Sequence, residues 1–500
     1  MKNWIAAWKA DKLAGSLQLS FLASVANAFW NSALLSISIP GIGTIMPFRI
    51  CLLLTAALYL LWAVREKDCF WKDATTLEKW CYLLIAIMLV YGVLSLPRAI
   101  DFGFTFRKLF NLCFDLCFFF LMLRLCRDEK LFRRALYVCA VMVALLCIAG
   151  AYEVFFGGIF SQKYDDYLRI FWFKGLYQPP VVTFPNTNDY NISLDMCWAV
   201  FLLLICRRWD RISRLEKVLA TLPFPVLLFL AISGQGRFAV AVLCVLFAGF
   251  VLFLWIKGKK SLRIAVIPLV LCLFVQFSNQ YYFIVPPIQQ YLVQMEEYRQ
   301  TVTETTPSTP DTPEKPTLQL GNPKRENLED DFFRVNEDTG EKELNVGAGS
   351  GGTRTRLLIH AFSCFLHSYG LGVGLGNTEV LVQEYHIIPE GTLWGIHCFV
   401  ARIIADYGVF VLIPLCVIAF LLLKRIWALL SAGFRQHDRQ GTAFAVLFFS
   451  VLLTYPLTST APADAQDLIA MWIYLASVVL IAGHLTENTS HGVIPEETIL

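Results

Sequence analysis

The stretch GIHCFVARIIADYG, residues 395–408, places ionisable groups in an otherwise apolar segment. Arg402 and Asp406 are four residues apart and therefore share one face of a helix. Charges in an apolar span are costly, so this pair is either a self-neutralising ion pair facing the helix bundle or part of a buried polar site. His397 stands nine residues before Asp406, half a turn out of phase, so we expect Asp406 to orient Arg402 and not the histidine.

His397 lies where the apolar segment begins, and a histidine can exchange a proton near neutral pH. Such a residue suits a general base that accepts a hydroxyl proton. A single histidine can equally be structural. Three other histidines of the same region, at positions 360, 367 and 386, keep that alternative open.

Arginines supply the second candidate chemistry. Arg237 ends the turn SGQGR between two apolar runs, and Arg354 and Arg356 stand in TRTR, residues 353–356. The planar guanidinium donates two parallel hydrogen bonds and suits phosphate. Three such groups at one membrane face could hold a diphosphate. Alternatively, Arg237 extends to the membrane surface and the other two are solvated loop charges.

The elements that must position these residues are membrane helices. The chain has 500 residues, of which 57% are hydrophobic and only 16% charged. Runs of about 18 or more apolar residues predict transmembrane helices, since the backbone must satisfy its own hydrogen bonds in lipid. We therefore predict an all-α integral membrane protein with about twelve spans, near 18–38, 46–64, 80–96, 107–124, 135–156, 189–206, 217–233, 238–256, 262–283, 397–423, 441–456 and 466–484.

Basic residues predict the orientation of this bundle. They concentrate in alternate connections, as in CRRWDRISRLEK and KRIWALLSAGFRQHDRQ. The positive-inside rule makes that side cytoplasmic, with both termini inside. The net charge of +3 thus reports orientation, and no separate basic stripe indicates a nucleic-acid partner.

The chain divides into four predicted regions. Residues 1–179 hold the first five helices, 180–283 hold helices six to nine, and 397–500 hold the last three helices and a cytoplasmic tail. Between helices nine and ten, residues 284–396 form a large extracytoplasmic loop. Its part 300–350 is rich in Thr, Pro, Glu and Asp and is expected to be disordered. Residues 353–396 are expected to be ordered, with an amphipathic helix along the membrane surface or against the bundle.

Several kinds of site are not indicated. The 15 cysteines fall mostly within apolar runs, and no CxxC spacing predicts zinc or a disulfide framework. No GxxxxGK[ST] motif predicts nucleotide binding. We therefore expect neither a metal nor a cofactor.

The polar stretches, in their order, resemble the O-antigen ligase and polymerase superfamily of membrane glycosyltransferases. In that family a Phe-x-Asn-x-Asn motif precedes a helix, a Ser-rich turn ends in arginine, an arginine-led segment ends in Gly-Val-Gly-x-Gly-Asn, and a histidine is followed by an acid and a glycine. The matching residues are Phe184, Asn186, Asn188, Ser233, Arg237, Arg356, Gly372, Val373, Gly374, Gly376, Asn377, His397, Asp406 and Gly408. The chain departs from the pattern at Thr187, at Cys398-Phe399 and in having Asp at position 406.

The resemblance implies a GT-C-like bundle in the bacterial cytoplasmic membrane, with an active site facing outside. It implies transfer of a glycan from undecaprenyl diphosphate to a glycan, lipid or protein hydroxyl. His397, Arg237 and Arg356 are then the catalytic candidates. Binding roles fall to Arg354, Asn186, Asn188, Arg402, Asp406, Gly374 and Gly376. A transporter (flippase) of polysaccharide or lipid-linked oligosaccharide is the alternative, although no internal repeat supports it.

Overall fold

The computed structural model describes residues 11–29, 37–39, 43–156, 169–171, 175–177, 180–184, 186–234, 236–277, 333–335, 342–344, 350–385, 387, 396, 398–460 and 468–490. Most of the stretch expected to be disordered, 300–350, lies outside the described residues. His397 lies outside them as well.

Every predicted apolar run contains helix. In the first half these are α2 (Lys12–Asn27), α3 (Pro47–Glu66), α4 (Thr76–Ser95), α5 (Phe102–Leu125), α6 (Glu129–Phe156) and α7 (Thr187–Arg207). In the second half they are α8 (Arg214–Leu219) with α9 (Pro223–Ser233), α10 (Arg237–Lys257), α11 (Lys259–Leu262) with the helix continuing to Phe277, α16 (Phe399–Tyr407) with α17 (Val409–Arg435), α18 (Arg439–Thr458) and α19 (Ile469–Ser490).

Eight helical stretches of the described residues are long and apolar enough to cross a membrane. They are Pro47–Glu66, Thr76–Arg98, Glu129–Val154, Thr187–Arg207, Arg214–Ser233, Arg237–Lys257, Val409–Arg435 and Arg439–Thr458. The other four predicted runs hold α2, the charge-bearing α5 and the shorter apolar helices Arg263–Phe277 and Ile469–Gly483. The chain is thus built as a multi-pass α-helical membrane protein, and twelve spans stay a prediction.

The prediction of one continuous helix over 397–423 is wrong. The chain breaks at Gly408, whose φ of 63° and ψ of −148° end α16 and precede α17. A side chain could not stand there, because a Cβ would come within 2.2 Å of the Gly370 carbonyl oxygen. Arg402 and Asp406 therefore lie on the nine-residue helix α16 and not within the spanning helix α17.

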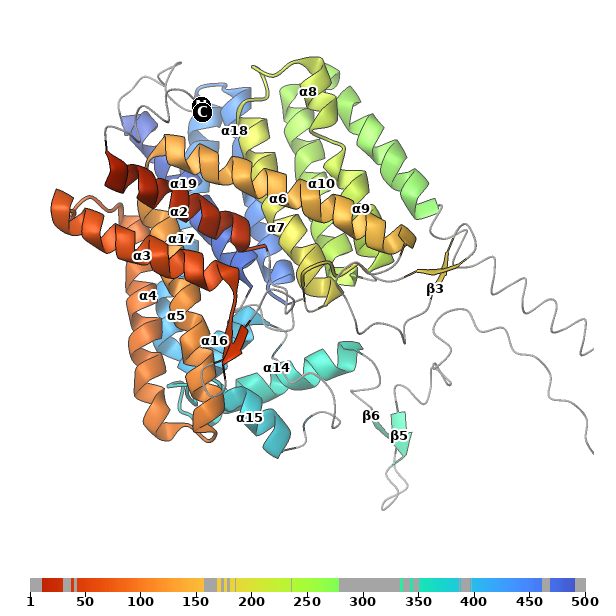
Figure 1. The fold of residues 1–500 in the computed structure, drawn as a ribbon. Coiled ribbons are helices and arrows are strands. Elements are labelled where there is room, and N and C mark those ends of the chain that lie inside the picture. Colours follow the sequence, from red (N-terminus) through yellow and green to blue (C-terminus); the bar gives the residue numbers. More distant parts are fainter. Residues whose placement is uncertain are drawn as a thin grey trace, which may run out of the picture.

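The centre of the bundle is formed by α7 and α19. Nearly every side chain of α7 from Asp189 to Leu203 is buried, and α7 packs against α6, α9, α10, α18 and α19. Around this core, α10 packs on α18, and α17 packs on α18 and α4. In Figure 1, α2, α3 and α6 run obliquely across the bundle, whereas α4, α5 and α10 run along it.

The described strands form three short antiparallel hairpins. They are β1 (Ile37–Ile39) with β2 (Gly43–Ile45), β3 (Arg169–Phe171) with β4 (Gly175–Tyr177), and β5 (Phe333–Val335) with β6 (Lys342–Leu344). These hairpins lie in connections, so the helical character expected from the sequence holds for the bundle.

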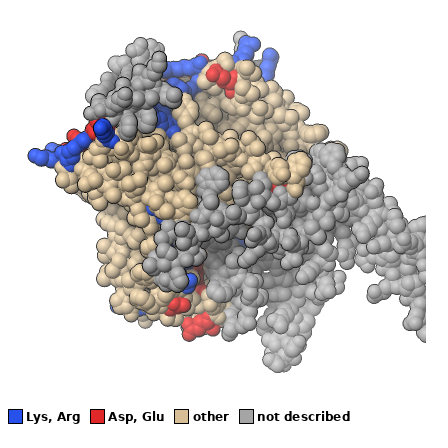
Figure 2. Space-filling view, in the orientation of Figure 1, with Lys and Arg blue, Asp and Glu red and all other residues tan. Residues whose placement is uncertain are grey.

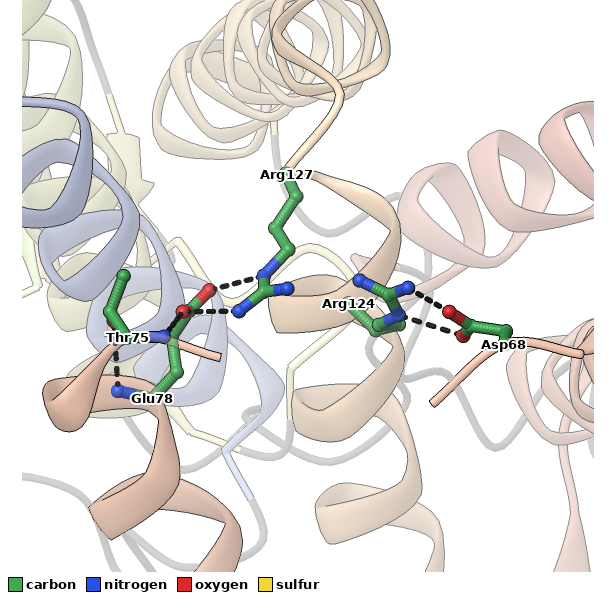
Figure 3. Close-up of polar contacts among 5 residues, drawn as sticks. All are labelled: Asp68, Thr75, Glu78, Arg124 and Arg127. Carbon is green, nitrogen blue, oxygen red and sulfur yellow. Dashed lines mark hydrogen bonds and ion pairs between the residues drawn. The ribbon is translucent and has the colours of Figure 1, made fainter. Parts of the chain in front are cut away.

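One end of the bundle carries paired charges between helices (Figure 3). Arg124, at the end of α5, donates a hydrogen bond to Asp68, which follows α3, and forms an ion pair with it. Arg127 donates to both carboxylate oxygens of Glu78 at 2.7 and 2.6 Å. Glu78 also accepts from the Thr75 amide, while Thr75 accepts from the Glu78 amide, a capping box that starts α4. The expected basic connections are thus tied together at this end.

The opposite end carries α14 (Ser350–His367), α15 (Asn377–Glu384) and α16, away from α8 in Figure 1. A helix expected near residue 353 is therefore present as α14. On the face shown in Figure 2, Lys and Arg gather mainly at the upper and upper-left edges, and a smaller group of acidic and basic residues lies at the lower end. The surface between these two ends is largely neither basic nor acidic. An uncharged band between charged ends is what a membrane-spanning bundle requires.

Candidate functional site

The four polar stretches of the sequence meet at one end of the bundle. The start of α7 lies against the turn between α9 and α10, because the Thr187 hydroxyl donates to the Gly234 carbonyl at 3.2 Å. Arg354 of α14 lies over the ring of Phe238 in α10, 4.7 Å from its centroid. The segment after α14 is bonded to α16. Two groups of residues result, one around Asp406 and one around Arg237.

Asp406 is fully buried and is bonded on all sides. Its Oδ1 accepts the Thr378 hydroxyl at 2.5 Å, and its Oδ2 accepts the Gly376 amide at 3.2 Å and Arg402 Nε at 3.4 Å. The ion pair expected from the four-residue spacing is therefore present. The carboxylate also fixes the start of α15, where anionic charge is favourable.

The pair is not self-contained. Arg402 Nη1 also lies 3.6 Å from Glu379 Oε1, and Glu379 Oε2 lies 3.3 Å from Lys108 Nζ. Arg402, Glu379 and Asp406 are 3% exposed or less, whereas Lys108 is partly exposed on α5. Two cations and two carboxylates balance, which is how a buried charge cluster avoids a large desolvation cost. We call these four residues the Asp406 network.

The glycine-rich segment 370–376 is fastened to this network by backbone contacts. Val373 and Gly374 donate their amides to the carbonyls of Ala405 and Asp406 at 2.8 and 3.0 Å. Gly372, Gly374 and Gly376 all have positive φ. At Gly372 a Cβ would lie 2.5 Å from the Asp406 carbonyl oxygen, so glycine is required for this close approach.

His360 connects α14 to the same network. Its Nε2 lies 3.2 Å from the Thr378 carbonyl oxygen, which can only accept, so this nitrogen carries the proton. Burial lowers the pKa of His360, while the Thr378 carbonyl opposes that shift. His360 is six residues after Arg354, so these two residues are separated by about 9 Å along the axis of α14.

Arg237 and Arg354 form the second group, which we call the arginine pair. Arg237 is exposed at the first residue of α10, and Arg354 is half-buried. Burial lowers the pKa of Arg354, and the neighbouring positive charge of Arg237 lowers it further. Among the described residues, neither guanidinium forms an ion pair with a carboxylate. Two cations and the positive end of a 21-residue helix thus meet in one place, an arrangement that attracts an anion.

The start of α7 packs against the turn that precedes Arg237. Asn186 caps the helix by accepting the Asp189 amide at 2.9 Å and donating to the Asp189 carboxylate at 2.7 Å. One turn farther along, Asn191 lies under the α9–α10 turn, and a Cβ on Gly234 would come within 2.6 Å of its amide nitrogen. The Asn191 side chain is buried and makes no hydrogen bond in the described structure.

A buried acid holds the segment that precedes α7 in the sequence. Glu153 of α6 is 1% exposed, and its Oε2 accepts the amides of Val181 and Val182 at 2.9 and 2.8 Å. Val182 has a φ of 50°, a conformation that a valine rarely adopts without such support. Glu153 therefore holds the segment that leads into the Asn186 cap.

The structure brings together most of the predicted site residues, in two groups. Arg402, Asp406, Gly374 and Gly376 belong with the Asp406 network, and Arg237 and Arg354 lie together near Asn186. Asn188 and Arg356 are half-buried, in the first turn of α7 and in α14. The position of His397 falls outside the described residues, just before the start of α16.

Sequence reasoning missed Lys108, Glu379, Glu153 and Asn191. Lys108 did carry a signal, because a lysine inside a predicted apolar run is expensive unless paired. Glu379 followed the glycine motif directly and could have been included with it. Glu153 carried the same signal, since it lies inside the predicted run 135–156. Asn191 gave no comparable signal, because it is uncharged and packs under the α9–α10 turn, which is distant in the sequence.

No known family model matches the chain. The chain is similar to the teichuronic acid biosynthesis protein TuaE of Bacillus subtilis (strain 168), with 28% identity over 127 residues. The matched segment is 25% of this chain and 25% of that protein.

Proposed function

We propose that this protein is a membrane glycosyltransferase that moves a glycan from undecaprenyl diphosphate to a hydroxyl acceptor during surface polysaccharide assembly. The similarity to a teichuronic acid biosynthesis protein supports a role in polysaccharide assembly. The membrane-spanning helices fit a lipid-linked donor. In this proposal the site faces the extracytoplasmic side of the cytoplasmic membrane. The acceptor is a glycan, lipid or protein hydroxyl.

The observation that carries the proposal is the arginine pair. Two guanidinium groups are held near each other at the start of α10 without a carboxylate partner in the described structure. A diphosphate would compensate both charges and accept hydrogen bonds from the guanidinium forks. The anionic diphosphate of a prenyl-linked donor lies at the membrane surface. The spanning helix α10 begins at Arg237, so the arginine pair also lies where a span meets that surface.

The proposed reaction is a displacement at the anomeric carbon. The acceptor oxygen forms a bond to that carbon while the bond to the diphosphate oxygen breaks, and the electron pair leaves with the diphosphate. The arginine pair, together with Arg356 nearby on α14, stabilises the negative charge of the leaving group. His397 takes the acceptor proton.

The Asp406 network has a positioning role in this proposal. Arg402, Glu379 and Asp406 are buried, and all four residues are bonded within the network, so they act through the helices they hold. Asp406 holds α16 against the start of α15 through its hydrogen bonds. At the start of α16, the Phe399 amide donates to the Ser459 carbonyl at 2.9 Å. The network thereby holds α16, which begins two residues after position 397 in the sequence.

The test is a transfer assay with purified protein, a lipid-linked glycan donor and a hydroxyl acceptor. Arg237→Ala and Arg354→Ala should each lower transfer by about a hundredfold, a scale typical of losing one preorganised charge contact. Arg237→Lys should restore only part of it, because an ammonium lacks the planar fork. Arg107→Ala is the matched control, since Arg107 is exposed near the same end of the bundle and, among the described residues, bonds only the Gly103 carbonyl. Full activity in both site variants would refute the proposal.

A flippase is the second candidate, and one buried acid favours it. Asp195 lies in the middle of the spanning helix α7, is 1% exposed, and its Oδ2 makes no hydrogen bond in the described structure. Ionisable groups at such depth occur in proton-coupled transporters. Movement of a fluorescent lipid-linked glycan across proteoliposomes, lost in Asp195→Asn but kept in Arg237→Ala, would favour transport over transfer.

A further inference from the structure

The outward face of α14 is apolar, although this helix lies at the end of the bundle. Its inward face packs through Leu357, His360, Ala361 and Cys364, which are all buried. On the other side, Leu358, Ile359, Phe362 and Leu366 are 42 to 62% exposed. A helix at a water-exposed end is expected to be polar on its outer face. An apolar face on both sides indicates that the outer side does not meet water.

Both ends of this segment are tied to the first residues of spanning helices. At one end Arg354 lies over Phe238, in the first turn of α10. At the other end, just after α14, the Gly370 carbonyl accepts the amide of Val409, the first residue of α17, at 2.9 Å. Because α10 and α17 begin their membrane spans at these points, α14 runs within the plane where the spans begin.

The apolar face continues onto helices that meet lipid. The Tyr91 hydroxyl of α4 donates to the Leu371 carbonyl at 2.6 Å, and α4 exposes Val90, Val93 and Leu94. Next to Val409, α17 exposes Phe410 and Ile413. Tyr369, between α14 and α17, is 93% exposed, and tyrosine is enriched at the boundary between lipid and water.

We infer that α14 is an interfacial membrane helix whose face of Leu358, Ile359, Phe362 and Leu366 contacts the acyl chains of phospholipids in the adjacent leaflet. Such helices lie in the plane of the headgroup and acyl boundary. Arg354 at the start of this helix is thereby held at the depth of lipid phosphates. Contact of α14 with lipid does not depend on the proposed transfer reaction.

Photocrosslinking of purified protein in phospholipid nanodiscs tests this inference. Phe362 is replaced by the photoreactive residue p-benzoylphenylalanine. Because position 362 is exposed and already aromatic, this replacement should leave the packing of α14 intact. The same replacement at Ile413, exposed on the spanning helix α17, is the lipid control. The replacement at Asp210, whose side chain is 59% exposed in a polar connection, is the water control.

Mass spectrometry after irradiation should show a phospholipid adduct at position 362 with a yield close to that at position 413. This yield should exceed that at position 210 by about tenfold, because only a face at acyl depth offers abundant C–H groups. The same adduct should appear with the probe at Ile359, on the same face. A crosslinked dimer would instead assign this face to a second copy of the chain, and a crosslink within residues 278–332 would assign it to the chain's own loop. Either result, or an adduct yield no higher than at position 210, would overturn the inference.

Discussion

The Asp406 network and the arginine pair lie at the same end of the bundle but treat charge in opposite ways. In the network, two carboxylates and two cations compensate each other, and the central carboxylate accepts three hydrogen bonds. In the arginine pair, two cations are adjacent and no carboxylate is bonded to either in the described structure. A compensated buried cluster stabilises a conformation, whereas an uncompensated cluster is suited to an external anion.

The two regions therefore should respond differently to mutation. Changes in the network should lower the stability of the folded protein, and activity should fall with it. Changes in the arginine pair should lower activity while stability stays the same.

Gly408→Ala should have the largest effect. A Cβ at this position would lie 2.2 Å from the Gly370 carbonyl oxygen and 2.3 Å from the Leu371 carbonyl carbon, and φ is 63°. Both neighbours are backbone, so the break between α16 and α17 cannot be kept. Size-exclusion chromatography of a fluorescent fusion should show loss of the folded peak. Gly103→Ala is the control, because a Cβ there would meet only the Asp101 side chain, at an ordinary contact distance of 3.5 Å, among the described residues outside its own helix backbone. A normal peak for Gly408→Ala would contradict the break.

Asp406→Ala should destabilise the protein by about 3–5 kcal/mol, the usual cost of leaving a buried charge without its partner. Asp406→Asn should cost less, since an amide still accepts from Thr378 or Gly376. Arg402→Leu in the Asp406→Ala background should recover only part of the loss, because Glu379 then loses Arg402. Thermal unfolding in detergent measures the series.

Asp101→Ala serves as its control, since Asp101 is an exposed helix cap of α5 and its loss should cost about 1 kcal/mol. Should Asp406→Ala unfold at the temperature of Asp101→Ala, the network would not be the stabilising cluster described above.

Binding of an anion to the arginine pair should raise the stability of the folded protein. Inorganic pyrophosphate at about a hundred times its Kd should stabilise the wild-type protein by about 2.7 kcal/mol. Without ligand, Arg237→Ala combined with Arg354→Ala should unfold close to the wild-type temperature, since the contact of Arg354 with Phe238 contributes about 1 kcal/mol. With ligand, the double variant should gain nothing, while Arg107→Ala should gain as much as wild type. Equal gains in all three proteins would show that pyrophosphate binds elsewhere.

The smallest effect is expected at the other end of the bundle. The hydrogen bonds from Arg124 hold the pKa of Asp68 below its ordinary value. Such a group contributes stability above its unfolded pKa of about 3.9 and loses it as pH falls towards the lower folded pKa. Asp68→Asn should therefore unfold slightly below wild type at pH 7, by about 1 kcal/mol, because the amide oxygen still accepts a hydrogen bond from Arg124. The difference should shrink as the pH approaches 4, and transfer activity should not change. A difference that grows on acidification would contradict the assigned pairing.

The arrangement of the Asp406 network was only partly visible in the sequence. The four-residue spacing of Arg402 and Asp406 predicted their ion pair correctly, because helical periodicity is a local property. The sequence did not predict that Glu379 and Lys108 join it, since these residues come from helices α15 and α5. It also wrongly extended one helix through Gly408, because hydropathy continues across the break while the backbone does not.

The apolar runs alone determined that this chain forms helices that cross a membrane, for a backbone in lipid must satisfy its hydrogen bonds within each segment. The order of the four polar stretches along the chain was visible in the sequence as well. Only the tertiary structure decided which of them touch. Packing placed Arg354 beside Arg237 and seated the glycine segment on Asp406, because such contacts depend on how distant helices fit together and leave no periodic mark in the sequence.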